Sequence, residues 1–406
     1  MDPRLALLSD VRSPLVAEVV IIGGGVAGLS TARALTELGL KDVVVLERAT
    51  VGSGGSGKSS GIVRCHYGIP SLAAMAWHAL PVLEHATDIL GAPSGYTKTG
   101  YLVGVDQRNL GALRANVAMQ QGLGIPVELV GHETAHELWP GARFEDFAEF
   151  AYEPCGGYGD GHQTALAFAV AARRGGAHLR QRTPVVSLVT RHDRLAEVVL
   201  ADGSRIATSN VVLAAGPWSP ALAAAVGVAL PVRAQRAQVL LVDPGTMLGP
   251  VPVFSDLVSL QYVRREGPEI LVGDSDHSDP VWCDPDGYRE RVSDQELAVV
   301  VPKFAHRFPG LDGAALSSSY AGCYDVTPDY NPVMGACPVD GLWLCAGFSG
   351  HGYKISPAVG DLMADLIVTG RSRHDDVEAR DFRLERFEED RFLTSPHPYV
   401  GAGQMR

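Results

Sequence analysis

The chain has 406 residues, which is enough to bury a large core and favours two domains over one compact unit. Its 46 acidic and 34 basic residues give a net charge of −12 without a cationic block, which argues against nucleic acid or an anionic membrane as the main partner. The six cysteines are scattered without the spacing of metal ligands, so we expect free thiols, no metal site and a cytoplasmic location.

Neither a targeting sequence nor a membrane span is predicted. Charges interrupt the first 18 residues, which lack the apolar core of a signal peptide. The longest uncharged stretch lies between Arg205 and Arg233, but Gly-Pro-Trp-Ser-Pro stands in its middle. There we expect a strand over residues 210–215, Ser219 as a helix N-cap and Pro220 as the first helical residue. The stretch is therefore typical of a strand–turn–helix unit.

A glycine-rich turn is the first motif that carries chemistry. The apolar run from Val19 to Ile22 suits a buried strand, and the spacing G-x-G-x-x-G follows it at Gly23, Gly25 and Gly28. The first glycine permits a sharp turn, and the second lets a pyrophosphate approach the backbone. The third lets the next helix, predicted over residues 26–38, pack close to the strand. This context predicts a dinucleotide-binding turn.

An acidic residue follows the second predicted strand, which covers residues 43–46. Glu47 lies 24 residues beyond the first glycine, where a carboxylate can accept hydrogen bonds from both ribose hydroxyls and would repel a 2′-phosphate. FAD or NAD is therefore expected, and NADP is not. The residues predicted to contact the cofactor in this part of the chain are Gly23, Gly25, Val26, Ala27, Gly28, Glu47 and Arg48.

A second glycine-rich stretch, residues 52–59, matches the pattern G-x-x-x-x-G-K-S and makes a P-loop nucleotide hydrolase the rival function, with 239–243 as its acidic strand. Two features argue against that rival. No strand runs directly into Gly52, and Gly61 with two β-branched residues after it is a poor helix start. We interpret the stretch as a loop that approaches the same dinucleotide through Gly57, Lys58, Ser59 and Ser60.

Later segments alternate between strand and helix patterns. Helices are predicted over 71–90, 109–121 and 164–174, and strands over 177–183 and 185–189. Residues 227–322 are mostly β. After a strand at 342–346, a glycine-rich turn covers 347–354, and Ser356 caps a helix that Pro357 starts and Gly370 ends. The last residues, from His374, predict a charged helix and then a mobile tail to which no function is assigned.

These segments together resemble the FAD-dependent D-amino-acid oxidase, glycine oxidase and sarcosine oxidase superfamily. The similarity is greatest to the sarcosine oxidase branch, including its β-subunit-like members, and rests on the opening motif and on residues 56–64, 159–177, 211–219, 324–335 and 347–367. It implies an α/β fold with a discontinuous Rossmann-type FAD-binding domain and a smaller β-rich substrate domain. The expected boundaries are 1–85, 152–226 and 323–386 for the first, 86–151 and 227–322 for the second, and 387–406 for the tail.

The resemblance also implies the site residues. Arg64 and Lys354 align with positions that hold a substrate carboxylate, and Tyr324 with one that lines the substrate side of the flavin. A carboxylate removed from water needs the charge and hydrogen bonds that Arg and Lys offer. His66, Tyr67 and Tyr262 are further candidates, for which a packing role is the alternative. The remaining predicted cofactor contacts are Val185, Ala215, Gly216, Trp218, Gly350, His351, Gly352, Tyr353 and Lys354.

The implied reaction is oxidation of the C–N bond of an amino acid or N-methyl amine that bears a carboxylate. Hydride passes to flavin N5, and water hydrolyses the resulting imine. Oxygen or another acceptor would then take the electrons, so a dehydrogenase subunit of a larger flavoprotein complex is the alternative. The oligomeric state is left open.

Three departures from the superfamily limit the transfer of roles. The cysteine that binds FAD covalently in monomeric sarcosine oxidases aligns with Gly322, and Cys323 would point to the opposite face of a strand, so FAD is expected to be noncovalent. The lysine that activates oxygen aligns with Leu271, which keeps the dehydrogenase alternative open. An arginine near the flavin aligns with Gly61.

Overall fold

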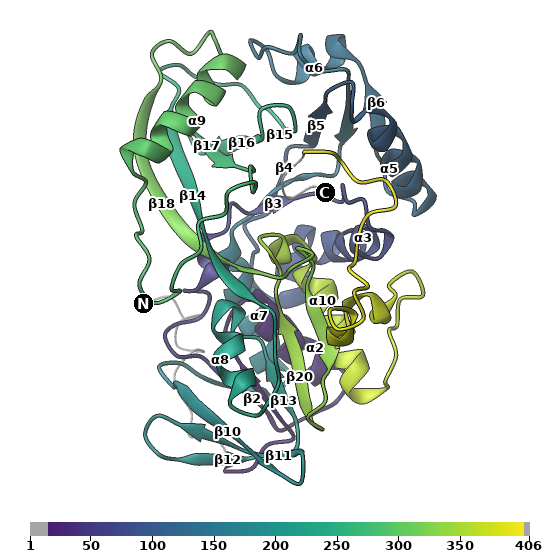
Figure 1. Cartoon of the computed structure of the whole chain (residues 1–406), viewed down its shortest axis with the longest axis vertical. Coiled ribbons are helices and arrows are strands. Elements are labelled where there is room, and N and C mark those ends of the chain that lie inside the picture. The colour runs from purple at the N-terminus through teal and green to yellow at the C-terminus, as the bar shows by residue number, and fades with distance from the viewer. Residues whose placement is uncertain (1–14, 402–406) are drawn as a thin grey trace.

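The first predicted strand lies inside a six-stranded sheet in the computed structural model, which describes residues 15–401 (Figure 1). The strand order is β19-β20-β13-β1-β2-β9, and neighbours are parallel except for β19 at one edge. Segments distant in the sequence thus build one Rossmann-type sheet, which confirms the predicted discontinuous fold. The strands span Val19–Ile22 (β1), Val43–Leu46 (β2), His178–Arg180 (β9), Val211–Leu213 (β13), Val333–Ala336 (β19) and Leu342–Ala346 (β20).

Both faces of this sheet are buried, as the continuous apolar run of β1 predicts. Val19 and Ile21 enter the core beneath the helices of one face, whereas Val20 and Ile22 enter the core on the other side. The first face is covered by α2 (Val26–Glu37), α3 (Pro70–Glu84), α4 (Ala86–Leu90), α7 (Gly161–Arg174) and α10 (Gly352–Val368). The second face is covered by a small sheet of β10 (Val185–Arg191), β11 (Arg194–Leu200) and β12 (Arg205–Ala207), and by α8 (Ser219–Ala224).

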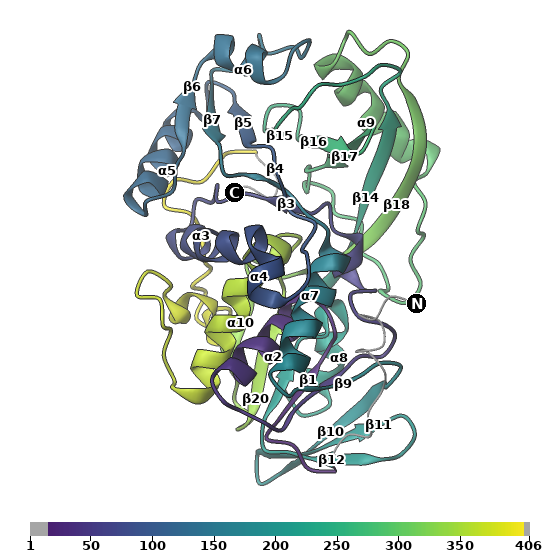
Figure 2. The ribbon, with the colours of Figure 1, turned by 180° about the vertical axis from the view of Figure 1, so that it is seen from behind.

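The other lobe is built around an eight-stranded sheet with the order β18-β14-β17-β16-β15-β5-β7-β6, which is the predicted β-rich part (Figures 1 and 2). Its strands are β5 (Tyr101–Val105), β6 (Glu128–Val130), β7 (Glu149–Glu153), β14 (Arg233–Asp243), β15 (Val253–Asp256), β16 (Gln261–Glu266), β17 (Glu269–Asp274) and β18 (Ala315–Val326). The helices of this lobe are α5 (Leu110–Gly122), α6 (His132–Leu138) and α9 (Asp294–Arg307). The α/β fold class is confirmed, while the exact domain boundaries remain a prediction.

A third, small sheet lies between the two lobes (Figure 2). It consists of β3 (Ile62–Val63), β8 (Gly157–Tyr158) and β4 (Thr97–Lys98), with β8 in the middle. Gly61 precedes β3 with a φ of +68°, and a Cβ there would lie 1.9 Å from the Gly159 carbonyl oxygen. No side chain fits this position without moving the backbone, so the backbone geometry here requires a glycine.

The predicted start of the last long helix is wrong. α10 begins at Gly352, so Pro357 lies inside the helix and Ser356 does not cap it. A proline inside a helix leaves the carbonyl four residues earlier without its usual amide donor. Here that carbonyl belongs to Tyr353, and the Ser356 hydroxyl donates to it at 2.7 Å. The Ser356 hydroxyl therefore replaces the backbone amide donor that Pro357 lacks. The first turn of α10 includes Tyr353 and Lys354.

Two further local predictions are corrected. The turn after β13 is a 3-10 helix, Gly216–Trp218, that runs directly into α8, so Trp218 occupies the N-cap position and Ser219 is the first helical residue. The predicted charged helix after His374 is instead two short 3-10 turns, Ala379–Phe382 and Leu384–Arg386.

The segment predicted to be a mobile tail packs against both lobes as far as it is described. In Figure 1 it runs from the lobe of α10 to the lobe of α5. Tyr399 within it is only 3% exposed. Residues 1–14 and 402–406, which include most of the segment inspected for a signal peptide and the last residues of the tail, lie outside the described part. Between residues 15 and 401, none of the helices has the length and apolar character needed to cross a bilayer.

Candidate functional site

A groove with a volume of about 950 Å³ lies where β1, β2 and β13 end. This is the edge of a parallel sheet at which Rossmann-type folds bind nucleotides. Most of the predicted cofactor contacts line it, together with Tyr324: Gly23, Gly25, Val26, Ala27, Glu47, Arg48, Lys58, Ser59, Val185, Ala215, Gly216, Trp218, Gly350, Gly352 and Tyr353. The remaining predicted cofactor contacts do not line the groove; these are Gly28, Gly57, Ser60, His351 and Lys354.

The glycines of the first motif shape the groove by close backbone approach. Gly23 has a φ of +119°, and a Cβ there would lie 2.2 Å from the carbonyl oxygen of Ala214. A Cβ on Gly28 would lie 2.2 Å from the Gly23 carbonyl oxygen, so this glycine tightens the turn and does not face the groove. The N-terminus of α2, at Gly25 to Ala27, faces the groove with its partial positive charge, which suits a pyrophosphate.

The Glu47 carboxylate is fixed at the end of β2 by two backbone donors. Its Oε2 accepts a hydrogen bond from the Gly24 amide at 2.7 Å, and its Oε1 accepts one from the Ala49 amide at 2.7 Å. Each carboxylate oxygen keeps a lone pair with which it can accept from a ribose hydroxyl. On the same wall the Arg48 guanidinium lies 3.9 Å from the centre of the Trp218 ring. These residues fit the adenosine half of FAD.

The loop that resembles a P-loop has a different structure. β2 ends at Leu46, well before Gly52, and the 3-10 turn Gly55–Lys58 leads into β3 instead of an α-helix. The hydroxyl of Ser56, a residue that sequence reasoning did not single out, accepts a hydrogen bond from the Val26 amide at 3.1 Å. The loop therefore closes on the start of α2 and supports the dinucleotide interpretation against the nucleotide hydrolase.

Within this loop, Lys58 binds the opposite wall of the groove. Its Nζ lies 2.6 Å from the Tyr288 hydroxyl and 2.7 Å from Glu290 Oε1. Burial opposes the charge, but these hydrogen bonds prevail and raise the pKa of Lys58. Ser60 lies outside the groove, and its carbonyl accepts a hydrogen bond from Arg264 at 2.6 Å.

Two buried cations come together beside the groove. Arg64, which follows β3, is 7% exposed, and Lys354, in the first turn of α10, is 6% exposed. Burial, and then the charge of Arg64, hold the pKa of Lys354 well below its usual value. Within the described residues no carboxylate forms an ion pair with either cation. We call Arg64, His66, Tyr67, His351 and Lys354 the cation cluster.

The histidines of the cation cluster are neutral. Burial, followed by nearby cations, lowers the pKa of both His66 and His351 to about 3. His351 Nε2 lies 2.8 Å from the Tyr330 carbonyl, which can only accept, so Nε2 carries the proton and Nδ1 accepts from the Tyr67 hydroxyl at 3.4 Å. The Tyr67 ring in turn lies 4.6 Å from the Arg64 guanidinium. The two histidines of the cation cluster thus add no positive charge beside Arg64 and Lys354.

A buried acid lies close to this cluster without pairing with it. The Oε2 of Glu153 accepts a hydrogen bond from the Cys65 amide at 2.8 Å. Burial raises the pKa of Glu153 to about 7, although that hydrogen bond and the charge of Arg64 act in the opposite direction. Sequence reasoning missed Glu153, because a single glutamate in a strand carries no recognisable pattern.

The two predicted tyrosines of the β-rich lobe are neighbours. Tyr324 on β18 lines the groove, and Tyr262 on β16 is 7% exposed. Burial and the adjacent phenol of Tyr324 raise the pKa of Tyr262 well above its usual value. The Tyr262 ring covers Gly273 on the next strand, where a Cβ would lie 1.9 Å from the ring. Tyr262 therefore packs against the neighbouring strand, and its candidate role in the site stays a prediction.

Asp325 is a groove residue that the sequence did not reveal as functional. Its Oδ2 accepts a hydrogen bond from the Gly347 amide at 2.7 Å, and its carbonyl accepts one from the Ser349 amide at 3.0 Å. Burial raises the pKa of this carboxyl group to about 6. Asp325 thereby holds the glycine-rich turn before α10 against the groove. In the sequence, its position within the Tyr-Asp-Val-Thr-Pro-Asp segment, which is part of the resemblance to the superfamily, could have pointed to Asp325.

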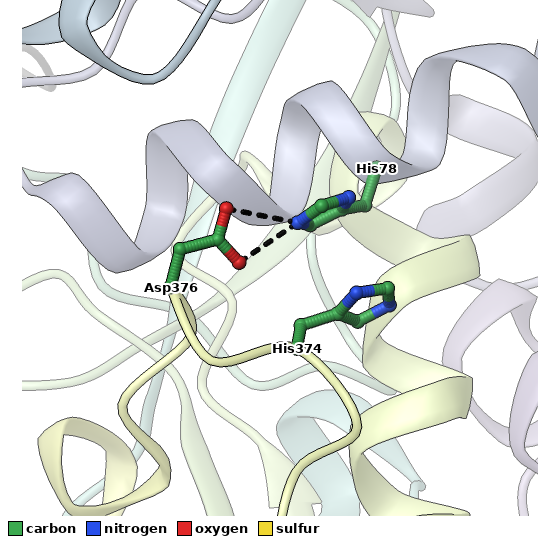
Figure 3. Close-up of side chains that lie close together, drawn as sticks. All are labelled: His78, His374 and Asp376. Carbon is green, nitrogen blue, oxygen red and sulfur yellow. Dashed lines mark hydrogen bonds and ion pairs between the residues drawn. The ribbon is translucent and has the colours of Figure 1, made fainter.

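A separate group consists of His78 on α3 and of His374 and Asp376 on the loop that follows α10 (Figure 3). His78 Nε2 lies 2.8 Å from Asp376 Oδ1, and the two imidazole rings are stacked with centres 3.9 Å apart and an angle of 16° between their planes. A metal ion lies in the plane of each imidazole that binds it. The observed contacts in this group are the ring stack of the two histidines and the hydrogen bond between His78 and Asp376.

Comparison with known proteins places the groove in a family context. Residues 18–366 match the family model described as FAD dependent oxidoreductase. The 4-methylaminobutanoate oxidase (formaldehyde-forming) of Paenarthrobacter nicotinovorans is 26% identical over 413 residues, which cover 97% of this chain and 48% of that protein. This chain therefore spans about half the length of that relative.

Two other proteins match over nearly their full length. Sarcosine oxidase subunit beta of Rhodobacter capsulatus is 25% identical over 386 residues, which cover 93% of this chain and 90% of that subunit. The crystal structure of L-proline dehydrogenase from P. horikoshii superimposes with a TM-score of 0.84 at 25% identity, and it covers 93% of this chain and 99% of that one.

Proposed function

This chain belongs to the family of FAD-dependent oxidoreductases, and from that premise we propose that it oxidises a carboxylate-bearing amine whose carboxylate binds Arg64 and Lys354. Family membership confirms the predicted resemblance and the predicted cofactor. The observation that carries the substrate proposal is the cation cluster, in which two buried cations have no anionic partner among the described residues. The substrate supplies the missing anion.

The residues of the groove fit FAD. Glu47 would take the ribose hydroxyls, while the turn at Gly23 and Gly25 and the N-terminus of α2 would take the pyrophosphate. Ser59, Tyr324 and the turn held by Asp325 would line the end near the cation cluster. When bound, FAD accepts the two electrons that leave the substrate as its C–N single bond becomes a C=N double bond.

The cation cluster selects for a carboxylate by desolvation. Arg64 offers a planar fork of donors and Lys354 a point charge, and each has already lost its water shell. A carboxylate between them gains charge-assisted hydrogen bonds, whereas an amine without one leaves both cations unpaired. The cluster thus fixes one end of the substrate. Water then hydrolyses the imine to a carbonyl compound and a free amine.

The substrates named in three relatives share this chemistry. 4-Methylaminobutanoate, sarcosine and L-proline are all secondary amines that carry a carboxylate. We therefore propose a secondary amino acid as the first substrate class to test, with primary amino acids next.

A dehydrogenase within a larger complex is the second candidate. Its support is the near full-length similarity to a β subunit of sarcosine oxidase and to an L-proline dehydrogenase. Leu271, which aligns with the oxygen-activating lysine of sarcosine oxidases, is 1% exposed in the core of the β-rich lobe. In this second candidate function, a partner protein supplies the electron acceptor, which is not oxygen.

An anaerobic absorbance spectrum tests both versions. The protein loaded with FAD is mixed with sarcosine, 4-methylaminobutanoate, L-proline, glycine or a D-amino acid, and air is then admitted. Bleaching of the flavin band with rapid recovery in air indicates an oxidase, and bleaching without recovery indicates a dehydrogenase. A flavin band that no member of the panel bleaches contradicts the proposed substrate class.

A further inference from the structure

The segment from Ser395 to Gly401, here called the 395–401 segment, is bound by buried groups of both lobes. The Ser395 hydroxyl donates to the Gly68 carbonyl at 3.0 Å. Asn116 of α5 donates to the His397 carbonyl at 3.1 Å. Asn109, just before α5, accepts from the Val400 amide at 2.7 Å and donates to the Val400 carbonyl at 3.1 Å. Both asparagines are 1% exposed, so two buried polar side chains are committed to holding this segment.

Tyr399 is the side chain that the segment delivers into the protein. It is 3% exposed, and its hydroxyl lies 2.8 Å from Nε2 of His66, which is completely buried. The two rings are nearly parallel, with centres 6.0 Å apart and an angle of 19° between their planes. On the other side of the imidazole, Nδ1 of His66 lies 3.9 Å from Glu153 Oε1. The phenol is thus the hydrogen-bond partner of Nε2, and the Gln120 side chain also interacts with the imidazole.

The position of His66 in turn affects the orientation of Arg64. The backbone carbonyl of His66 accepts a hydrogen bond from Nη1 of Arg64. The guanidinium is otherwise held by aromatic faces, with the ring of Tyr67 4.6 Å away and that of Tyr101 5.8 Å away. Aromatic faces hold a cation without fixing its orientation strongly, so the carbonyl sets the direction of the fork. A change in the position of His66 therefore rotates the donors that face a substrate carboxylate.

We propose that Tyr399 is a positioning residue of the substrate site: it anchors His66, and through the carbonyl of His66 it orients the Arg64 guanidinium for a carboxylate. The 395–401 segment thereby contributes to substrate binding. This inference rests on the proposed function of the cation cluster.

The substitution Tyr399→Phe tests the proposal, because it removes one hydroxyl and keeps the ring. We expect the KM for the best substrate of the panel to rise about three- to tenfold, which is the effect of one hydrogen bond, with a change in kcat below about twofold. The dissociation constant for acetate, a simple carboxylate probe, should rise by the same factor. It is measured from the shift of the flavin band and, independently, from the rise in melting temperature with acetate concentration.

Tyr96→Phe is the matched control. The Tyr96 hydroxyl donates a hydrogen bond to the Cys155 carbonyl at 2.6 Å, and Tyr96 lines neither the groove nor the cation cluster. A second variant, Asn109→Ser, loosens the 395–401 segment at Val400 while leaving Tyr399 intact. It should raise KM and the acetate dissociation constant in the same direction, whereas Tyr96→Phe should leave both within about twofold.

The outcomes separate the two proposals. Unchanged KM and acetate binding in Tyr399→Phe, or equal effects in Tyr399→Phe and Tyr96→Phe, would overturn the role of Tyr399. A wild-type protein whose flavin no amine bleaches would contradict the proposed function instead, and acetate binding would still report whether Tyr399 orients Arg64.

Discussion

The groove and the cation cluster adjoin each other but are built on opposite principles. The wall of the groove at the first motif consists of backbone atoms, the end of a helix and one carboxylate, Glu47, all from a short part of the sequence. The cation cluster consists of desolvated side chains that two distant segments, residues 64–67 and 351–354, bring together. The first region recognises its ligand by shape and backbone donors, the second by charge. Steric changes should therefore disrupt binding in the groove, and charge changes should disrupt binding in the cation cluster.

The largest effect is expected from adding a methyl group to the turn of the groove. In Gly23→Ala the new Cβ would meet the backbone of Ala214 at 2.2 Å, and backbone cannot move aside cheaply. The purified variant should contain no measurable flavin, as read from the ratio of absorbance at the flavin and protein bands. Gly39→Ala is the control, because Gly39 also has a positive φ, +98°, but a Cβ there meets nothing within 4 Å. Full flavin content in Gly23→Ala would contradict the assigned turn.

The second largest effect is expected from removing a charge in the cation cluster. Arg64→Ala deletes the fork that binds the carboxylate, and losing about 3 kcal/mol of charge-assisted hydrogen bonds corresponds to about a hundredfold rise in KM. Flavin content should stay unchanged, because Arg64 does not line the groove. Arg114→Ala, which removes an exposed arginine paired with Glu149 at 2.8 Å, should leave KM unchanged. An unchanged KM in Arg64→Ala would contradict the proposed role of Arg64 in binding the substrate carboxylate.

A smaller effect with a distinct pH signature is expected from Lys354→Met. The pKa of Lys354 in the folded protein lies below that of an unfolded lysine, because burial and the charge of Arg64 disfavour the ammonium form. Between these two pKa values the unfolded chain binds more protons, so the stability of the wild type rises with pH. Lys354→Met removes this dependence.

The melting temperature should therefore be a few degrees higher in Lys354→Met than in the wild type at neutral pH, and the gap should narrow as pH approaches that of a free lysine, about 10.4. KM should rise about tenfold, since one of two cations is lost. Lys41→Met, at an exposed position, is the control for stability. A gap that stays constant with pH would show that the ammonium of Lys354 is not the cause.

The same contrast explains what the sequence could predict. Gly23, Gly28 and Glu47 form a local pattern whose geometry follows from strand, turn and helix, and the structure places them accordingly. Arg64 and Lys354 carry no local pattern, so only resemblance to known proteins brought them together. The start of α10 was misjudged because Pro357 normally opens a helix, and nothing local shows that Ser356 compensates for it. Tyr399 was missed because an isolated tyrosine among prolines has no periodicity, and its role exists only through contacts with His66.

The smallest effect is expected at Cys323, which lines the groove. Its sulfur lies 3.4 Å from that of Cys283, and burial together with this neighbour raises the pKa of its thiol to about 12. A thiol that stays protonated is a poor nucleophile toward a flavin. We therefore expect all flavin to be released from the wild type by acid precipitation, and Cys323→Ser to have the same flavin content and spectrum. Flavin that stays on the precipitated wild-type chain but leaves the Cys323→Ser variant would show a covalent bond at this position, and the groove would then hold its ligand by more than shape and backbone donors.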